Sequence, residues 1–427
     1  MRKRKREFPT KAMGSWLGTL MEYRPGRLGR GALLGTGGLI ARAVIQAAYL
    51  LVLSRWLGAS GYGLFAGCVA LAVLGAPLAN WGSSLLLTRY IAQDRGRSRA
   101  MFATAITQTV IVGCLLTLVV LGLSTSVLQE TLPLAPMLLL ALSELILLPI
   151  AWAAASQCYA LERGGASAVV VCLIPLGRTM VVLACLALGL PGTADVVAIA
   201  HFAGSVVGCV VVFVLMVRMD GWPQWRERLP FGTATRQGTT YALSSVASTS
   251  YQEVDKVLML QLLGAAVVGT YTVAFRVVSI FLVPVSALVS ATLPRLVSQH
   301  GDIRAPRTFR VLVLVAMTYG LLAGMFILLF RSFIPRIFGA GYGQVTDLLF
   351  LLAPWPVLFA LGQCWAAKLT AINRQATRSV LEMLGLFVVL LLNLMLLPHV
   401  GAKASAISLL ITEVLVLVGF LFFVERK

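Results

Sequence analysis

Runs of about 20 mostly apolar residues recur along almost the whole chain, each long enough to cross a bilayer as a helix. Hydrocarbon satisfies no backbone polar group, so spans of this kind fold as helices. With 59% of its 427 residues hydrophobic and 12% charged, a soluble protein of this length would expose large apolar patches. We therefore predict an all-α polytopic membrane protein with twelve transmembrane helices. The predicted spans lie near 31–54, 62–87, 101–123, 133–155, 165–188, 194–217, 239–262, 268–293, 309–331, 344–367, 378–398 and 402–424.

The distribution of basic residues predicts the orientation of these spans. The formal net charge of +19 would suggest nucleic-acid binding in a soluble protein. Most of the 35 Lys and Arg residues, however, fall on one side of the membrane, and the short loops of the other side hold only Arg55, Arg331, Arg336 and Lys403. Cytoplasmic loops carry such an excess, which also attracts anionic lipid. We expect both termini in the cytoplasm, a phospholipid bilayer as partner and no nucleic acid.

A short internal repeat predicts two similar halves. The segment "WLGASGYGLF" (56–65) is matched 206 residues later by "LLGAAVVGTY" (262–271), and the same offset places Gln46 on Gln252. Six spans per half return the chain to its starting side, which favours two parallel six-helix bundles in pseudo-symmetric relation around a central cavity. We expect a basic cytoplasmic tail with an interfacial helix (1–30), an N-terminal bundle (31–217), a cytoplasmic linker (218–238) and a C-terminal bundle (239–427).

Several ionisable residues fall inside the predicted spans, where each costs about 2.5–3.5 kcal/mol on insertion scales. They should therefore face protein or water and have partners. The positive residues are Arg42, Arg178, Lys256 and Arg276. The others are Glu144, Glu253, Asp255, Glu382, Glu413 and His201.

Four of these residues can be explained as two structural ion pairs. Glu253 and Lys256 lie at i, i+3 on one helix, a spacing that brings side chains together. Glu144 and Arg178 lie on consecutive helices and form a second candidate ion pair. For both sets, structural pairing is the interpretation that we weigh against a role in a cavity.

Arg42 and Arg276 have no acid within four residues on their own helices, so we predict that they line a central cavity. Guanidinium groups match phosphate oxygens, and such contacts strengthen at low dielectric. An anionic substrate follows. The predicted substrate-binding residues are Arg42, Gln46, Arg178, Gln252, Asp255, Lys256 and Arg276.

Glu253, Asp255 and His201 are candidates for binding a coupling ion, H⁺ or Na⁺. For His201 the competing interpretation is a neutral buried imidazole bonded to a backbone carbonyl. The seven cysteines lie in apolar runs without a CxxC pair, so we expect no metal site and no cofactor. No GxxxxGK[ST] segment occurs, which argues against ATP hydrolysis by this chain.

Three segments resemble a known family: "LSRWLGASGYGLFAGCVALAVLGAPLANWGSSLLLTRYIAQ" (53–93), "DKVLMLQLLGAAVVGTYTVAFRVVSIFLVPVSALVSATLPRL" (255–296) and "IFGAGYGQVTDLLFLLAP" (337–354). They are similar to the oligosaccharide flippase (polysaccharide transporter, Wzx-type) family of the multidrug/oligosaccharidyl-lipid/polysaccharide exporter superfamily. Asp255 and Arg276 coincide with the family pattern.

The resemblance implies a flippase that moves undecaprenyl-pyrophosphate-linked oligosaccharide by alternating access. Its cargo would be an O-antigen, capsule or exopolysaccharide repeat unit, carried from the inner to the outer leaflet of the bacterial cytoplasmic (inner) membrane. A glycan polymerase is a partner that the resemblance leaves open.

Three other functions stay open beside this one. A cation-coupled multidrug exporter of the same superfamily would favour an acidic cavity, whereas the first span supplies Arg42 and no acid. A membrane-embedded glycan polymerase or ligase would favour acids on a large outer loop, and the predicted outer loops are short. A non-transporting scaffold would have a dry, ion-paired interior. We therefore expect transport rather than enzymatic catalysis.

Overall fold

The computed structural model describes residues 27–128, 130–298 and 305–425. Most of the predicted basic tail, including the part expected to form an interfacial helix, lies outside these residues. The first half contains α2 (Arg27–Asn80), α3 (Ser83–Gln93), α4 (Ser98–Ser126), α5 (Leu134–Leu142), α6 (Leu148–Ala160), α7 (Gly164–Ala187) and α8 (Ala194–Asp220). The second half contains α9 (Phe231–Leu263), α10 (Ala265–Ile280), α11 (Val283–Ser298), α12 (Ala305–Phe330), α13 (Ile334–Phe338), α14 (Val345–Leu352), α15 (Trp355–Ala371), α16 (Gln375–Val400) and α17 (Lys403–Glu425).

Helix α2 supplies two membrane crossings because its backbone breaks at Gly58. That residue has φ 67° and ψ −179°, a conformation that glycine adopts without the steric cost of a Cβ. Arg42 in the first arm and Asn80 in the second line the same cavity. A straight helix would hold these residues about 57 Å apart at 1.5 Å per residue. The two arms therefore lie side by side, and the loop predicted near 55–61 is reduced to one residue.

The same turn recurs in the second half at Gly264, which has φ 82° and ψ 171° and separates α9 from α10. Among the described residues, nine helical segments are long and apolar enough to span a membrane by length and composition. The first of these is the broken α2 with α3 and crosses twice. The pair α10–α11, bent by 41°, adds one crossing, and α9 adds another although its polar residues lower its hydropathy. Counted in this way, the described residues fit the predicted twelve crossings.

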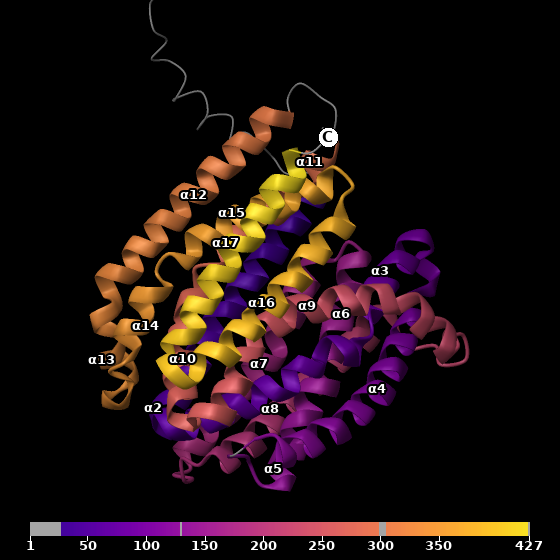
Figure 1. Ribbon diagram of the computed structural model, residues 1–427. Helices are drawn as coiled ribbons and strands as arrows, with labels where there is room; N and C mark the ends of the chain where they lie inside the picture. Colours follow the sequence, from indigo (N-terminus) through magenta and orange to yellow (C-terminus); the bar gives the residue numbers. More distant parts are fainter. Residues whose placement is uncertain (1–26, 129, 299–304, 426–427) are drawn as a thin grey trace, which may run out of the picture.

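The helices gather into two bundles (Figure 1). Helices α3–α8 occupy the lower right of the view, and α12–α17 the upper left. Helix α2 packs against α7 of the first bundle and against α9 and α10 of the second. It therefore belongs to the interface between the bundles, where a cavity shared by both halves would form.

Apolar packing joins the bundles at one end and separates them at the other. One buried cluster contains Leu53 and Phe65 of the first half together with Tyr271 and Trp355 of the second. We call this end, which carries Gly58 and Gly264, the Gly58 side. At the opposite end, the Asn80 side, each bundle has its own apolar cluster. An internal space between the bundles is therefore expected toward the Asn80 side.

Close backbone contacts close the Gly58 side. A Cβ on Gly63 of α2 would overlap the carbonyl oxygen of Ala265, and a Cβ on Gly269 of α10 would overlap the carbonyl oxygen of Ala59. The Tyr342 hydroxyl also donates to the Ser54 carbonyl at 3.1 Å. On the Asn80 side, the first turns of α9 stay against the first bundle, since Trp81 Nε1 donates to the Thr235 carbonyl at 3.1 Å.

Helix boundaries differ from the sequence prediction in two places. Helix α8 continues to Asp220 and α9 begins at Phe231, so only ten residues of the expected linker connect the helices. The second predicted span is interrupted at Trp81 and Gly82, which both have positive φ. Positive φ at these residues ends one helix and re-aims the next.

Candidate functional site

A cavity of about 590 Å³ lies between the two bundles. Its walls come from α2, the π-helical turn Ser143–Leu147, and α6 to α11. They run from Leu53 and Tyr62, next to the Gly58 turn, to Asn80 at the other end of α2. The polar and aromatic residues of the lining include Arg42, Gln46, Tyr49, Asn80, Glu144, Trp152, Arg178, His201, Gln252, Glu253, Lys256 and Arg276.

Arg42 is held in the cavity by an aromatic ring rather than by an acid. Its guanidinium carbon lies 4.7 Å from the centroid of the Trp152 ring of α6. Within the described part of the chain, no ion pair joins Arg42 to a carboxylate, in contrast to Arg178 and Arg276. A guanidinium stacked on an indole keeps its N–H groups directed sideways, where they remain available to a ligand.

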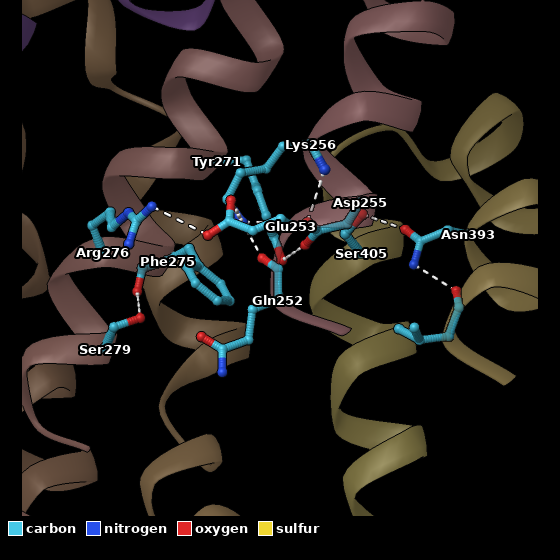
Figure 2. A network of polar contacts seen from close by, with 11 residues as sticks. Gln252, Glu253, Asp255, Lys256, Tyr271, Phe275, Arg276, Ser279, Asn393 and Ser405 are labelled. Carbon is cyan, nitrogen blue, oxygen red and sulfur yellow. Dashed lines mark hydrogen bonds and ion pairs between the residues drawn. The ribbon is translucent and has the colours of Figure 1, made fainter. Parts of the chain in front are cut away.

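Glu253 of α9 lies between two cations (Figure 2). Lys256 Nζ is 3.1 Å from Glu253 Oε2, and Arg276 of α10 places Nη2 3.3 Å from Glu253 Oε1. Lys256 also donates to the Gln252 carbonyl and lies 4.2 Å from the Phe275 ring centroid. The Lys256 side chain is 1% exposed, whereas that of Arg276 is 44% exposed and borders the cavity. The helical pair predicted from i, i+3 spacing is therefore present, and Arg276 shares its acid.

Asp255 lies behind this wall and does not line the cavity. One carboxylate oxygen accepts a 2.6 Å hydrogen bond from the Tyr271 hydroxyl, and the other is 3.4 Å from Lys256 Nζ. Asp255 is buried, with 5% of its surface exposed. Asp255, predicted to bind substrate, therefore does not border this cavity, and its carboxylate lies against Lys256 instead.

Glu144 organises a second buried network in the first bundle. Its Oε1 atom is 2.8 Å from Arg178 Nη2 and 2.7 Å from His201 Nε2. His201 Nδ1 is 2.8 Å from the Tyr49 hydroxyl. The histidine therefore bonds to two side chains, not to the backbone carbonyl that the sequence favoured. Glu144 lies in a π-helical turn, and such turns often occur at functional sites.

Charge in the cavity is unbalanced. Four cationic side chains line it, and the only carboxylates among its described lining residues are Glu144 and Glu253. Both carboxylates already pair with cations. With His201 neutral, the lining carries an excess of two positive charges, and Arg42 has no acid beside it. A cavity of this kind attracts anions.

A second cavity of about 370 Å³ adjoins the first and lies mainly within the second bundle. Arg42, Gln46 and Gln252 line both cavities. Its other walls include Trp355 and Phe359 of α15.

Most predicted site residues meet in one place, and some important ones were not predicted. Arg42, Gln46, Arg178, Gln252, Lys256 and Arg276 line the first cavity, as do the coupling candidates Glu253 and His201. Trp152 was missed because an indole in an apolar span looks like any other lipid-compatible residue. Tyr49, a polar residue one turn after Gln46 on the same helix face, also lines the cavity.

Two known protein families match parts of the sequence. A family described as "Polysaccharide biosynthesis protein" matches residues 28–300, and a family described as "MatE" matches residues 241–399. No curated protein sequence matches the chain.

Solved structures share the fold at low sequence identity. An inward-facing multidrug resistance MATE family transporter of the MOP superfamily has a TM-score of 0.70 and 17% identity, covering 90% of this chain and 97% of that one. An outward-facing structure of such a transporter has a TM-score of 0.68 and 17% identity, covering 95% of this chain and 98% of that one. A MOP superfamily transporter from Pyrococcus furiosus, described for the reverse polarity of its binding pocket, has a TM-score of 0.68 and 16% identity, covering 93% of this chain and 95% of that one.

At this identity the structural likeness concerns the fold alone, and both conformations match almost equally. The first family, by contrast, covers well over half of the sequence. The chain belongs to the polysaccharide biosynthesis protein family and shares the fold of MOP superfamily transporters.

Proposed function

We propose that the protein moves a polyprenyl-diphosphate-linked oligosaccharide across the bacterial cytoplasmic membrane, with both termini in the cytoplasm. The observation that supports this proposal most directly is the guanidinium of Arg42, which pairs with no carboxylate among the described residues and lies in a cavity whose described lining is positive. Together with Arg276, it offers several N–H donors at the center of the interface between bundles. A diphosphate has the charge and the oxygen geometry to accept them.

A diphosphate carries the negative charge that would neutralise the positive lining of the cavity. Burying an uncompensated charge is costly, and an anionic ligand that pairs with it recovers part of that cost. Arg178 is paired with Glu144, and Lys256 and Arg276 are paired with Glu253, so Arg42 offers the contacts that a ligand can make without displacing a carboxylate. The polyprenyl chain would stay in lipid beside the bundles, because transferring it into a polar cavity is unfavourable.

Glu253 offers a way to couple ligand binding to the binding of a proton. The Glu253 carboxylate forms ion pairs with Lys256 at 3.1 Å and with Arg276 at 3.3 Å. A bound diphosphate would therefore compete with this carboxylate for both cationic side chains. In our proposal, protonation of Glu253 frees the two cations for the ligand, and loss of that proton expels the ligand. His201 remains a candidate for the same role beside Glu144.

The experiment is transport in vesicles containing the purified protein. A fluorescent polyprenyl-diphosphate oligosaccharide is placed in one leaflet, and its appearance in the other is followed with an impermeant quencher. Arg42→Ala and Arg276→Ala should each weaken substrate binding at least about tenfold, the size expected for a lost charge-assisted hydrogen bond. Arg95→Ala is the matched control, because the Arg95 side chain is 64% exposed and lies outside both cavities.

Two outcomes would reject the proposal. Full transport by both arginine variants would show that the cationic cavity does not hold the cargo. Transport of cationic dyes without transport of lipid-linked glycan would favour a multidrug exporter, the function suggested by the match of the second half to the MatE family.

A further inference from the structure

The second cavity differs chemically from the first. Apart from the shared Arg42, its ionisable lining residues are the two carboxylates Glu382 and Glu413. Glu382 is paired with Arg378 of its own helix at 2.7 Å. Glu413 of α17 accepts a 3.1 Å hydrogen bond from Trp355 Nε1. Carboxylates repel phosphate, so this cavity does not suit a diphosphate.

The position of the second cavity relative to the first follows from the residues that line both. Gln46 of α2 and Gln252 of α9, the two residues related by the internal repeat, line both cavities together with Arg42. A ligand whose diphosphate rests on Arg42 therefore has the second cavity as its neighbouring space. The volume of about 370 Å³ falls within the usual range for small-molecule sites.

The lining combines apolar rings with a few hydrogen-bonding groups. Phe359 and Trp355 of α15 provide the aromatic surface, and Gln363, Ser279 and Ser286 provide amide and hydroxyl groups. A sugar ring presents apolar C–H faces and hydroxyl groups in alternate directions. Such a ring needs aromatic surface together with carboxylate, amide and hydroxyl partners, because a buried hydroxyl without a partner is costly.

We infer that the second cavity binds the sugar residues attached to the diphosphate, as a carbohydrate subsite of the second bundle. This inference rests on the proposed function. It assigns the diphosphate to the Arg42 region and the adjoining glycan to the space bordered by Glu413, Phe359 and Gln363. A carboxylate has several acceptor positions, so Glu413 can accept hydrogen bonds from sugar hydroxyls in addition to the one from Trp355.

Gly362 gives a direct way to fill this subsite. It lines the cavity, and a Cβ built there would have Glu413 Oε2 as its nearest neighbour, at 3.7 Å, an ordinary van der Waals contact. The backbone therefore accepts a side chain at this position, and Gly362→Leu would extend into the cavity beside Glu413. Gly122→Leu is the matched control, because Gly122 of α4 lies outside both cavities and its Cβ would meet nothing within 4 Å.

Two probes separate the glycan from the rest of the ligand. The first is undecaprenyl diphosphate without sugar, and the second is the undecaprenyl-diphosphate glycan that accumulates when the gene is deleted from the source bacterium. Affinity for each is measured with the full-length protein in nanodiscs. For Gly362→Leu, we expect the glycan-bearing lipid to bind about tenfold more weakly and the sugar-free lipid to bind within about twofold of wild type. Gly122→Leu should leave both affinities unchanged.

Each other outcome has a defined meaning. Equal weakening of both probes would show that the cavity holds the polyprenyl chain, and unchanged affinity for both would place the glycan elsewhere; either result overturns the inference. Glu413→Gln, which keeps an acceptor for Trp355, provides a second variant if Gly362→Leu folds poorly, and it too should weaken only the glycan-bearing probe. If the wild-type protein binds neither probe, the proposed function itself fails.

Discussion

Gly63 of α2 and Gly269 of α10 form a reciprocal contact across the interface between the bundles. Gly63 packs against the carbonyl oxygen of Ala265 at the start of α10, and Gly269 packs against that of Ala59, directly after the Gly58 break of α2. All four residues belong to the repeat with the offset of 206 residues. The pseudo-symmetry predicted from sequence thus becomes a physical contact, in which corresponding residues of the two halves meet near the pseudo-symmetry axis.

Enlarging either glycine should separate the two helices. Gly63→Val or Gly269→Val places a branched side chain against backbone that has no flexible end to yield, so we expect a loss of about 1–3 kcal/mol of stability. Thermal unfolding of the purified variants measures this loss. Gly122→Val introduces the same side chain where nothing lies within 4 Å and should unfold like the wild type. Equal melting temperatures for all three variants would contradict the close crossing.

Removing the acid of the buried network should destabilise the first bundle. Glu144→Gln leaves Arg178 without its carboxylate, and the loss of one member of a buried pair costs about 3–5 kcal/mol. Glu162→Gln breaks a pair of the same 2.8 Å separation, formed with Arg95, whose side chains are 64% and 58% exposed. That exposed pair should contribute at most about 1 kcal/mol. Similar losses in the two variants, measured by thermal unfolding, would argue against a buried structural role for Glu144.

Glu253→Gln should strengthen ligand binding while it weakens the fold. The carboxylate competes with a diphosphate for Lys256 and Arg276, so its removal leaves both cations freer for the ligand. We expect affinity for inorganic pyrophosphate to rise several-fold, as an increase in binding energy of about 1 kcal/mol would give, and the melting temperature to fall. Pyrophosphate titration calorimetry and thermal unfolding measure the two effects.

Asp347→Asn is the control for this prediction. It removes the acid of an exposed pair with Lys403, at 3.2 Å, a separation close to those around Glu253. It should change neither quantity. Weaker pyrophosphate binding by Glu253→Gln would reject competition and would indicate that the glutamate positions the two cations for the ligand.

The indole that supports Arg42 should matter for binding. Trp152→Leu keeps an apolar side chain but removes the ring over which the guanidinium lies at 4.7 Å, so Arg42 gains freedom that the ligand must again restrict. We expect affinity for undecaprenyl diphosphate to fall about three- to tenfold, consistent with a cation–π contribution of about 0.5–1 kcal/mol or more. Trp225→Leu, in the exposed segment between α8 and α9, is the control and should bind normally. An affinity unchanged by Trp152→Leu would show that the Trp152 ring does not contribute to ligand binding.

Much of the fold could be predicted from sequence because a lipid bilayer allows few backbone conformations in a membrane-spanning segment. A span must be helical and apolar, so its existence can be read from composition alone. Residues inside a span that break this pattern, such as Arg42 and Glu253, are visible for the same reason. The pair formed by Glu253 and Lys256 was also predictable, since both partners lie on one helix.

Tertiary structure alone decided how charges on different helices combine. Arg276 shares the carboxylate of Glu253 although it lies 23 residues away, on the next helix. Among the described residues, Arg42 lies against the Trp152 ring and pairs with no acid, and His201 contacts Glu144 rather than a backbone carbonyl. The physical reason is that ion pairing depends on separations of a few ångströms between helices. Hydrophobic patterning fixes which segments enter the membrane, but it leaves their rotation and mutual distance to packing.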